Sequence, residues 1–524
     1  MQSEEKNKAL LTKGRVFICM FAIALMGLIL RMYNLAKFGL WFDEAIFPLL
    51  INLLQKESLF LHVNVGGHTP ILFTLLLRAW MHIASNDFFL RSFSVIWAVF
   101  SIVAIYKLGE IIFSKRVGIL SALFLSISPL HIYYSQELTH YSLSILFAIF
   151  SSYCFIRFLK YKDFYSSIFY VLSTLAFIYI FPVNLLIFPV QNIFFFMVYY
   201  KDKYLRRRWL ILQIITFLLS LYWMLFIVLQ VVRFHQLNIY SWIPRPSPNA
   251  LLQTFMVFSL GYHASWALQL TALIIVIYFS VTAIYYWRKE NEIFYLVSWL
   301  VFPVGIVWLV SQLQPFYLHR VFCFSLPAFY LLMAAGLINI SKQYLRRRMV
   351  ITAFYIILAI YSLGRYYENR LPYDYKERYT GIYPKKDYRR PATVLAKKFK
   401  DGDIILHISR SSFIPFIYYH GQRFPEYGIK LNDIYKDDWV RNRIDSNHDC
   451  ADLLAPIAFL EIKEKSDLGG YKRIWLVYSS WSFLENSNPK DKIGNKISYW
   501  FRKNFPKRKK YSFDGATDIY LFSN

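Results

Sequence analysis

The sequence predicts an α-helical membrane protein that crosses the bilayer many times and carries a small α/β domain at its C-terminal end. Of its 524 residues, 57% are hydrophobic and 17% are charged, whereas soluble chains are about half apolar and about a quarter charged. Apolar runs of about 18 residues or more, long enough to cross a bilayer, recur through residues 1–367. From residue 368 the composition changes, and 20 of the 32 acidic residues fall there.

The apolar runs predict eleven spans. Lysine and arginine residues precede the first run as in a signal peptide, but no small-residue cleavage site follows it, so we expect a retained helix. The predicted spans are residues 16–36, 88–113, 117–134, 140–159, 164–181, 183–200, 209–232, 266–287, 293–310, 321–340 and 349–367.

The basic residues predict the orientation of these spans. The net charge of +27 comes largely from short clusters between apolar runs, which is how membrane proteins mark their cytoplasmic side. That placement argues against nucleic-acid binding. With the N-terminus cytoplasmic and eleven spans, the C-terminal domain lies outside. The clusters that then lie inside are Lys115 and Arg116, Lys160 and Lys162, Lys201 to Arg208, Arg288 and Lys289, and Lys342 to Arg348.

Two further regions differ from the spans. Residues 37–87 form a first outer loop with shorter apolar stretches at 45–61 and 69–84, which predict helices lying along the membrane surface. One more transmembrane pair is the alternative, and it would leave the sidedness unchanged. Residues 368–524 predict an extracytoplasmic α/β domain, with strand-like runs at 403–409, 413–420, 473–480 and 518–524 and amphipathic helical patterns at 391–400 and 451–465.

The four cysteines, Cys19, Cys154, Cys323 and Cys450, lie far apart, and their spacing indicates neither a disulfide framework nor a metal site.

Acidic residues are rare before residue 368, and few of them fall on the predicted outer side. Carboxylates at the edge of the hydrocarbon are costly and usually functional. Asp43 and Glu44 are adjacent in LWFDEA after the first span, and Glu137 lies where the third span turns into the fourth. We therefore expect these three to meet at one outer surface. The two remaining outer-side acidic residues are Glu57 and Asp87.

Asp43 has two interpretations. Flanked by Trp41 and Phe42, its carboxylate would be partly desolvated, which raises the pKa and suits a general base. The alternative is a helix N-cap, which FDEAIF suits equally well.

Outer-side cations are candidates for phosphate binding, because an enzyme with a phosphate-linked donor needs positive charge to hold that phosphate. Arg320 begins the tenth span. For any one cation, contact with lipid headgroups is the alternative. The outer-side cations are His68, Arg78, Arg91, Arg233, His235, Arg245, His263, His319 and Arg320.

Several strings together resemble the bacterial branch of the dolichyl-phosphate-mannose protein mannosyltransferase family, which includes the lipid A aminoarabinose transferases. They are LRMYNLAKFGLWFDEA, GHTPILFTLLLRAW, the segment from FFLRSF to SPLHIYYSQELTHYSL, PFYLHRVFCFSLPAFYLLMAAGL, and DYRRPATVLAKKFKDGDIIL. The likeness is strongest over residues 30–160.

The resemblance implies the GT-C fold and roles for named residues. It makes Asp43 the base that takes the acceptor's proton, with Glu44 beside it and Glu137 as the acidic residue of the SQE-like turn. It makes His68 and Arg320 candidates for holding the donor phosphate. Arg78, one of the outer-side cations, is a third candidate for that phosphate. Thr69 stands where the family motif has a proline, and Val321 stands where an aromatic often follows the arginine.

The implied function is an inverting glycosyltransferase in the cell (inner) membrane. It would move a monosaccharide from a polyprenyl-phosphate donor to a lipid, glycan or protein acceptor, such as lipid A, outside the membrane. A divalent metal on Asp43 and Glu44 is possible but not required, because no cluster of oxygen ligands is visible.

Two alternatives remain open at this stage. One is an oligosaccharide polymerase or ligase, although a WWDYG string typical of oligosaccharyltransferases is absent. The other is a lipid or sugar transporter, which would need ionisable residues at mid-membrane.

Overall fold

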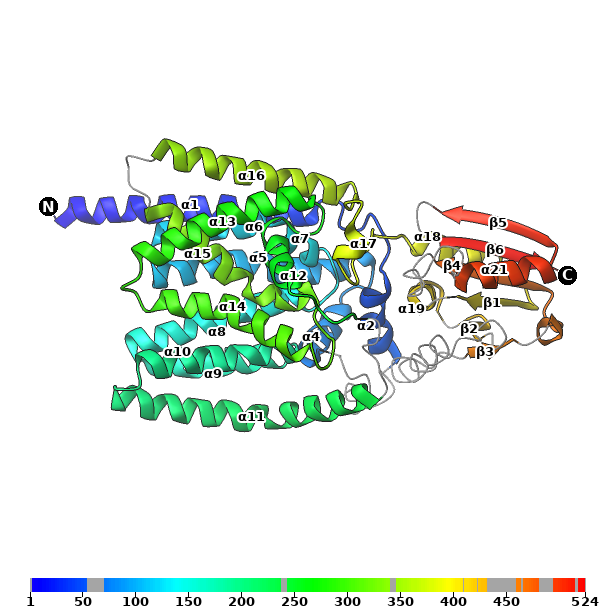
Figure 1. Ribbon diagram of the computed structural model, residues 1–524, viewed down its shortest axis with the longest axis horizontal. Helices are drawn as coiled ribbons and strands as arrows, with labels where there is room; N and C mark the ends of the chain where they lie inside the picture. Colours follow the sequence, from blue (N-terminus) through cyan, green and yellow to red (C-terminus); the bar gives the residue numbers. More distant parts are fainter. Residues whose placement is uncertain are drawn as a thin grey trace.

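The computed structural model describes residues 2–53, 70–236, 243–339, 345–408, 410–421, 423–430, 459–462, 465–479, 493–513 and 517–523. Figure 1 shows long helices running side by side as a bundle, with the N-terminus at one end and a separate sheet beyond the other end. We call these the N-terminal end and the domain end of the bundle.

Eight helices in the described part of the chain are long and apolar enough to cross a membrane. They confirm a multi-pass membrane protein and match eight of the eleven predicted spans. They are α1 (Gln2–Met32), α5 (Asp87–Ile112), α8 (Tyr141–Tyr161), α11 (Lys203–Gln236), α13 (Trp266–Tyr286), α14 (Glu292–Val310), η3 (His319–Ser325) continued by α15 (Leu326–Asn339), and α16 (Leu345–Tyr367).

The predicted span 117–134 is sharply bent in the structure. The chain instead forms α6 (Lys115–Ile127) and α7 (Pro129–Ser135), bent by 60°. Ser128 at the break has extended backbone and accepts a hydrogen bond from the N–H of His131. Pro129 has no N–H to continue the first helix but suits the first position of the second. A serine–proline pair therefore turns the chain where a span was expected.

Two predicted spans, 164–181 and 183–200, correspond to shorter apolar helices. These are α9 (Phe164–Ile178) and η2 (Pro182–Leu186) continued by α10 (Ile187–Val198). The loops before α9 and after α10 meet, since Lys162 pairs with Asp202 at 3.0 Å. The two elements therefore run out and back between the same ends as the longer helices, although each is shorter than the ~20 residues of a usual span.

The basic loops gather at the N-terminal end of the bundle. Lys160 before α9 pairs with Glu292 at the start of α14, with 3.2 Å between Nζ and the carboxylate. Lys160 also donates to the carbonyl of Ile111 at the end of α5. The loop that holds Lys160 therefore lies beside the end of α5 and the start of α14, at the N-terminal end of the bundle.

The described part of the first outer loop lies at the domain end. It holds α2 (Phe42–Leu53) and α4 (Ile71–Met81), which at 12 and 11 residues are too short to cross a bilayer. Figure 1 shows α2 between the bundle and the sheet. Residues 54–69, including His68, lie outside the described residues. A further helix here, α12 (Asn249–Leu260), follows α11 and was not predicted.

The C-terminal domain is a six-stranded sheet with helices, as expected for an α/β domain. The strand order is β3-β2-β1-β4-β6-β5, parallel from β3 to β4 and antiparallel across β6 and β5. The strands are β1 (Asp403–His407), β2 (Glu426–Lys430), β3 (Phe459–Glu461), β4 (Arg473–Ser479), β5 (Lys507–Phe513) and β6 (Thr517–Ser523). The helical elements are α17 (Tyr375–Arg378), α18 (Arg389–Lys398), α19 (Arg410–His420), η6 (Lys465–Leu468) and α21 (Ile493–Asn504).

The predicted strand at 413–420 is wrong, because these residues form most of α19. The helix is covered on two sides. Phe413, Ile414 and Ile417 pack against α2, while Phe416 packs against the sheet. A helix buried all round shows no polar face in its sequence, so its apolar run cannot be told from a strand. The predicted helix at 451–465 lies mostly outside the described residues, and residues 459–461 form β3.

Candidate active site

Helix α2 brings two carboxylates to the domain end of the bundle. The backbone N–H groups of Glu44 and Ala45 donate to the carbonyl of Trp41, so the helix begins directly after that residue. Asp43 and Glu44 therefore lie inside the first turn rather than at the cap position. Negative charge is favourable there because of the helix dipole.

Glu44 is fully buried and paired with Arg91 of α5. The Arg91 Nε donates to one carboxylate oxygen at 2.7 Å and Nη2 donates to the other at 2.5 Å. The N–H of Leu138 also donates to Glu44. Removing one partner of such a buried pair costs about 3–5 kcal/mol. Glu44 therefore joins the first outer loop to α5 and to the turn before α8, and no part of its carboxylate is left for a substrate.

Asp43 has a different partner. Its Oδ2 lies 3.3 Å from Nη1 of Arg320, in the first turn of η3. The Asp43 side chain is 36% exposed and the Arg320 side chain 15% exposed. The structure thus brings together residues 277 positions apart, and it leaves part of this carboxylate reachable from solvent.

Glu137 is the third carboxylate of this end. It is 3% exposed and follows Gln136, whose side chain donates to the carbonyls of Arg31 and Tyr33. The OH of Tyr366 donates to Gln136. These bonds attach the turn before α8 to the ends of α1 and α16, so the position of Glu137 is fixed by three helices.

A lysine from the segment between α17 and α18 completes the cluster. Lys385 donates from Nζ to the OH of Tyr366 at 2.8 Å and lies over the rings of Tyr133 and Tyr366. Burial lowers the pKa of Lys385, against the opposing effect of Glu137. The segment that enters the C-terminal domain therefore takes part in the candidate site.

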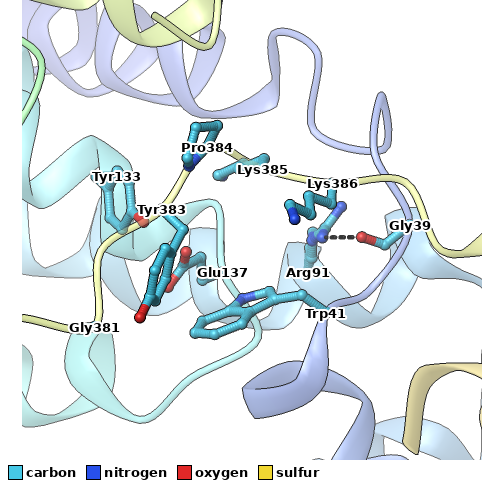
Figure 2. A pocket seen from close by; sticks show the side chains of 10 residues that line it. All are labelled: Gly39, Trp41, Arg91, Tyr133, Glu137, Gly381, Tyr383, Pro384, Lys385 and Lys386. Atoms are coloured by element: carbon cyan, nitrogen blue, oxygen red, sulfur yellow. Dashed lines mark hydrogen bonds between the residues drawn. The ribbon is translucent and has the colours of Figure 1, made fainter. Parts of the chain in front are cut away.

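A small recess, partly open to solvent, lies between this segment and the first outer loop. Figure 2 shows the Glu137 carboxylate between the rings of Tyr383 and Trp41 in this view. A few polar groups among aromatic side chains are usual for a ligand site. The recess is lined by Gly39, Trp41, Arg91, Tyr133, Glu137, Gly381, Tyr383, Pro384, Lys385 and Lys386.

Asp43 and Glu137 share a direction of pKa shift. Desolvation raises the pKa of Asp43, and Glu44 adds to the rise while Arg320 opposes it. Burial also raises the pKa of Glu137, with Glu44 and Asp43 adding and Lys385 and Arg320 opposing. A carboxylate with a raised pKa holds a proton more readily and is the better general base.

The remaining predicted site residues are not part of this cluster. Arg78 lies in the last turn of α4, and within the described residues no hydrogen bond or ion pair joins it to Asp43, Glu44 or Glu137. His68 lies outside the described residues.

As for a metal, the described residues hold no group of three or more His, Cys, Asp or Glu side chains that could bind one. Asp43 and Glu44 face different arginines and do not converge on one point.

Sequence reasoning missed Lys385 and gave Arg91 no role. Arg91 was one of nine outer-side cations, and its partner could not be chosen from spacing. Lys385 was assigned to the C-terminal domain because the composition changes at residue 368. A usable signal was nevertheless present, since Lys385 and Lys386 follow the last span closely, in a stretch rich in tyrosine.

Comparison with known proteins finds likeness in sequence and in fold. Residues 68–227 match the model of the family described as dolichyl-phosphate-mannose-protein mannosyltransferase. No curated protein matches the chain in sequence. Among solved structures, ArnT from Cupriavidus metallidurans in the apo state is similar over 97% of this chain and 98% of its own, with 11% identity and a TM-score of 0.60.

The chain has the GT-C fold. A second ArnT structure, bound to undecaprenyl phosphate, is similar over 96% of this chain and 97% of its own, with 12% identity and a TM-score of 0.53. The oligosaccharyltransferase AglB from Archaeoglobus fulgidus, in complex with an inhibitory peptide and a dolichol-phosphate, is similar over 89% of this chain and 69% of its own, with 10% identity and a TM-score of 0.52. This confirms the expected fold, including the sheet domain.

Proposed function

We propose that the protein is an inverting membrane glycosyltransferase that moves a monosaccharide from a polyprenyl-phosphate donor to a lipid, glycan or protein acceptor. The observation that carries this proposal is the Asp43–Arg320 pair, in which a partly exposed carboxylate faces a guanidinium at one end of a GT-C bundle. The similar ArnT structure that binds undecaprenyl phosphate supports a lipid-phosphate donor.

The pair provides two of the functions that such a transfer needs. A guanidinium recognises phosphate through several N–H donors and neutralises the charge that develops on the leaving group. With a donor bound, Arg320 would turn its N–H groups toward the phosphate. Asp43 would then lose an ion-pair partner and become a stronger base.

The reaction balances without a general acid. The acceptor hydroxyl attacks the anomeric carbon and forms the new C–O bond, while its proton passes to the Asp43 carboxylate. The bond between the anomeric carbon and the phosphate oxygen breaks, and its electron pair leaves with the polyprenyl phosphate. Attack from the face opposite the leaving group inverts the anomeric centre.

Glu137 and Lys385 have a supporting place in this proposal. Both line the recess beside Trp41, which is two residues before Asp43. The aromatic and charged lining suits the sugar of an acceptor, and we assign the recess to acceptor binding. Glu44, which is enclosed by Arg91, positions the loop and takes no part in the chemistry.

The basic clusters support an orientation in the membrane. They gather at the N-terminal end of the bundle, and positively charged loops mark the cytoplasmic side. The candidate site and the C-terminal domain would therefore face the outside of the inner membrane.

The test is donor specificity. Purified protein in liposomes is given polyprenyl-phosphate monosaccharides carrying labelled sugars, or a diphosphate-linked oligosaccharide, together with a membrane extract as acceptor. We expect transfer from a monophosphate donor. Transfer from the diphosphate-linked oligosaccharide alone would instead support an oligosaccharide transferase. Comparing the glycans of a deletion strain with those of its parent would identify the acceptor.

A further inference from the structure

The loop that carries Asp43 is held from two sides. From the bundle, Arg91 donates to the backbone carbonyls of Leu35, Phe38 and Gly39 at 3.0, 2.6 and 3.1 Å. From the other side, residues of the C-terminal domain reach the same stretch of backbone. The loop is therefore not positioned by the bundle alone.

Three side chains of the domain side make these contacts, and we call Asp387, Arg389 and Tyr419 the docking residues. Asp387 accepts from the N–H of Gly39 at 2.8 Å, and the OH of Tyr419 accepts from the N–H of Leu40 at 2.5 Å. Arg389 donates to a loop carbonyl, that of Ala36, at 3.2 Å.

Two of the docking residues, Tyr419 and Arg389, are also attached to the start of α5. The OH of Tyr419 donates to Oδ2 of Asp87 at 2.8 Å, and Nη1 of Arg389 lies 3.2 Å from the same oxygen. Asp87 is 6% exposed, and Arg91 follows it one turn later in α5. The hydroxyl of Tyr419 thus both donates and accepts a hydrogen bond, and the two bonds together fix the orientation of the side chain.

Gly39 shows how closely the two parts approach. A Cβ atom at this position would lie 2.8 Å from Asp387 Oδ1, 2.8 Å from the OH of Tyr419 and 2.9 Å from the N of Arg389. Real Cβ atoms do not come this near to other atoms, so a side chain here would force the docking residues away from the loop.

Apolar packing continues the contact along α19. Phe413, Ile414 and Ile417 are buried in one cluster with residues of the first outer loop, including Leu40 and Ala45. Figure 1 shows α19 on the side of the domain that faces α2. Buried apolar contacts and part-buried hydrogen bonds thus act on the same loop, and the hydrogen bonds to Gly39 and Leu40 lie four and three residues before Asp43.

We propose that the C-terminal domain is a positioning element of the active site, in which Tyr419 and Asp387 hold Gly39 and Leu40 so that Asp43 lies opposite Arg320. The expected loss of turnover rests on the proposed function, whereas the positioning of the loop by the domain does not. It assigns the domain a role in turnover that is separate from substrate binding.

The experiment compares Tyr419→Phe with Tyr418→Phe in the full chain. The matched control removes a neighbouring hydroxyl that donates to the carbonyl of Ser85, at the far end of the first outer loop from Gly39 and Leu40. We expect Tyr419→Phe to lower kcat about ten- to hundredfold with the donor KM unchanged, since misplacement of a catalytic group by about 1 Å has effects of this size. The control should keep the kcat of the wild type.

A second pair of variants covers the possibility that loss of the phenol disturbs folding. Asp387→Ala removes the acceptor for the N–H of Gly39, whereas Asp387→Asn keeps an oxygen acceptor of the same size. We expect Asp387→Ala to lower kcat and Asp387→Asn to restore most of it, at equal thermal stability.

Amide hydrogen exchange measures how firmly the backbone of the loop is held, and it does not depend on enzymatic activity. In Tyr419→Phe and Asp387→Ala, a peptide spanning residues 36–47 should exchange faster than in the wild type, with no change in Tyr418→Phe. Wild-type kcat and unchanged exchange in both variants would overturn the proposal. If the wild type transfers no sugar, the proposed function fails, while the exchange result still decides whether the domain holds the loop.

Discussion

At the scale of single residues, the Asp43–Arg320 contact combines partial exposure with charge. Arg320 is proposed to hold the donor phosphate in the ground state as well as in the transition state. Arg320→Ala should therefore weaken donor binding and also lower turnover, because a charge-assisted contact to phosphate is lost in both states. Donor binding and steady-state transfer measure the two effects. Arg245→Ala, which removes an exposed arginine before α12, serves as the control. Normal donor binding in Arg320→Ala would assign the phosphate to other cations.

The pH dependence of the reaction gives a second residue-scale prediction. The base must be ionised to accept a proton, so kcat/KM rises with pH through the pKa of Asp43. Desolvation raises that pKa above the ordinary 3.8 of an aspartate, an effect to which Glu44 adds and which Arg320 opposes. The acid limb should therefore lie above pH 3.8. In Glu137→Gln the acid limb should remain and move only toward lower pH, because the charge of Glu137 no longer repels that of Asp43. Loss of the acid limb in Glu137→Gln would make that residue the titrating base.

The sequence indicated part of this site. Asp43, Glu137 and Arg320 stand out because charged residues are rare beside apolar spans, and the structure brings all three to the domain end. The division of labour between Asp43 and Glu44 was not predictable, because adjacent residues on a helix point to different sides and spacing does not say which arginine each meets. Lys385 was missed because its neighbours along the chain belong to a domain of mixed charge.

At the scale of elements, glycines set how closely helices pack. A Cβ on Gly336 of α15 would lie 1.7 Å from the carbonyl oxygen of Phe279 in α13, whereas Gly305 of α14 has no atom within 4 Å of that position. Gly336→Ala should therefore push α15 from α13 and lower the melting temperature and the yield of folded protein. Gly305→Ala should leave both near the wild-type values. Thermal unfolding in detergent measures this, and equal stability of the two variants would contradict the packing.

The elements also mark where sequence patterns stop being informative. Long apolar runs identified the spans because only a helix of about 20 residues satisfies its backbone in lipid. The bend between α6 and α7 depends on the local geometry of Ser128 and Pro129, which a hydropathy pattern does not contain. Helix α19 was mistaken for a strand because contacts with the first outer loop, distant in sequence, bury the face that would otherwise be polar.

At the scale of the whole molecule, the account requires the two ends of the bundle to face opposite sides of the membrane. The basic loops lie at the N-terminal end and the sheet lies beyond the domain end. Reporter fusions after Lys203 and after Asn524 should therefore give opposite sides, the first cytoplasmic and the second outside. A fusion after Arg288 should agree with the first. The same side for Lys203 and Asn524 would contradict the orientation.

The central claim is that this GT-C bundle transfers sugar with Asp43 as the base, and sugar transfer by Asp43→Asn tests it most directly. The asparagine keeps the size of the side chain and its place in the first turn of α2, but it cannot take the acceptor's proton. With a polyprenyl-phosphate donor and protein of equal thermal stability, the turnover of the variant should fall by about 10²-fold or more. Donor binding should be nearly unchanged. Turnover close to that of the wild type would contradict the claim, because the carboxylate would then serve only the start of the helix.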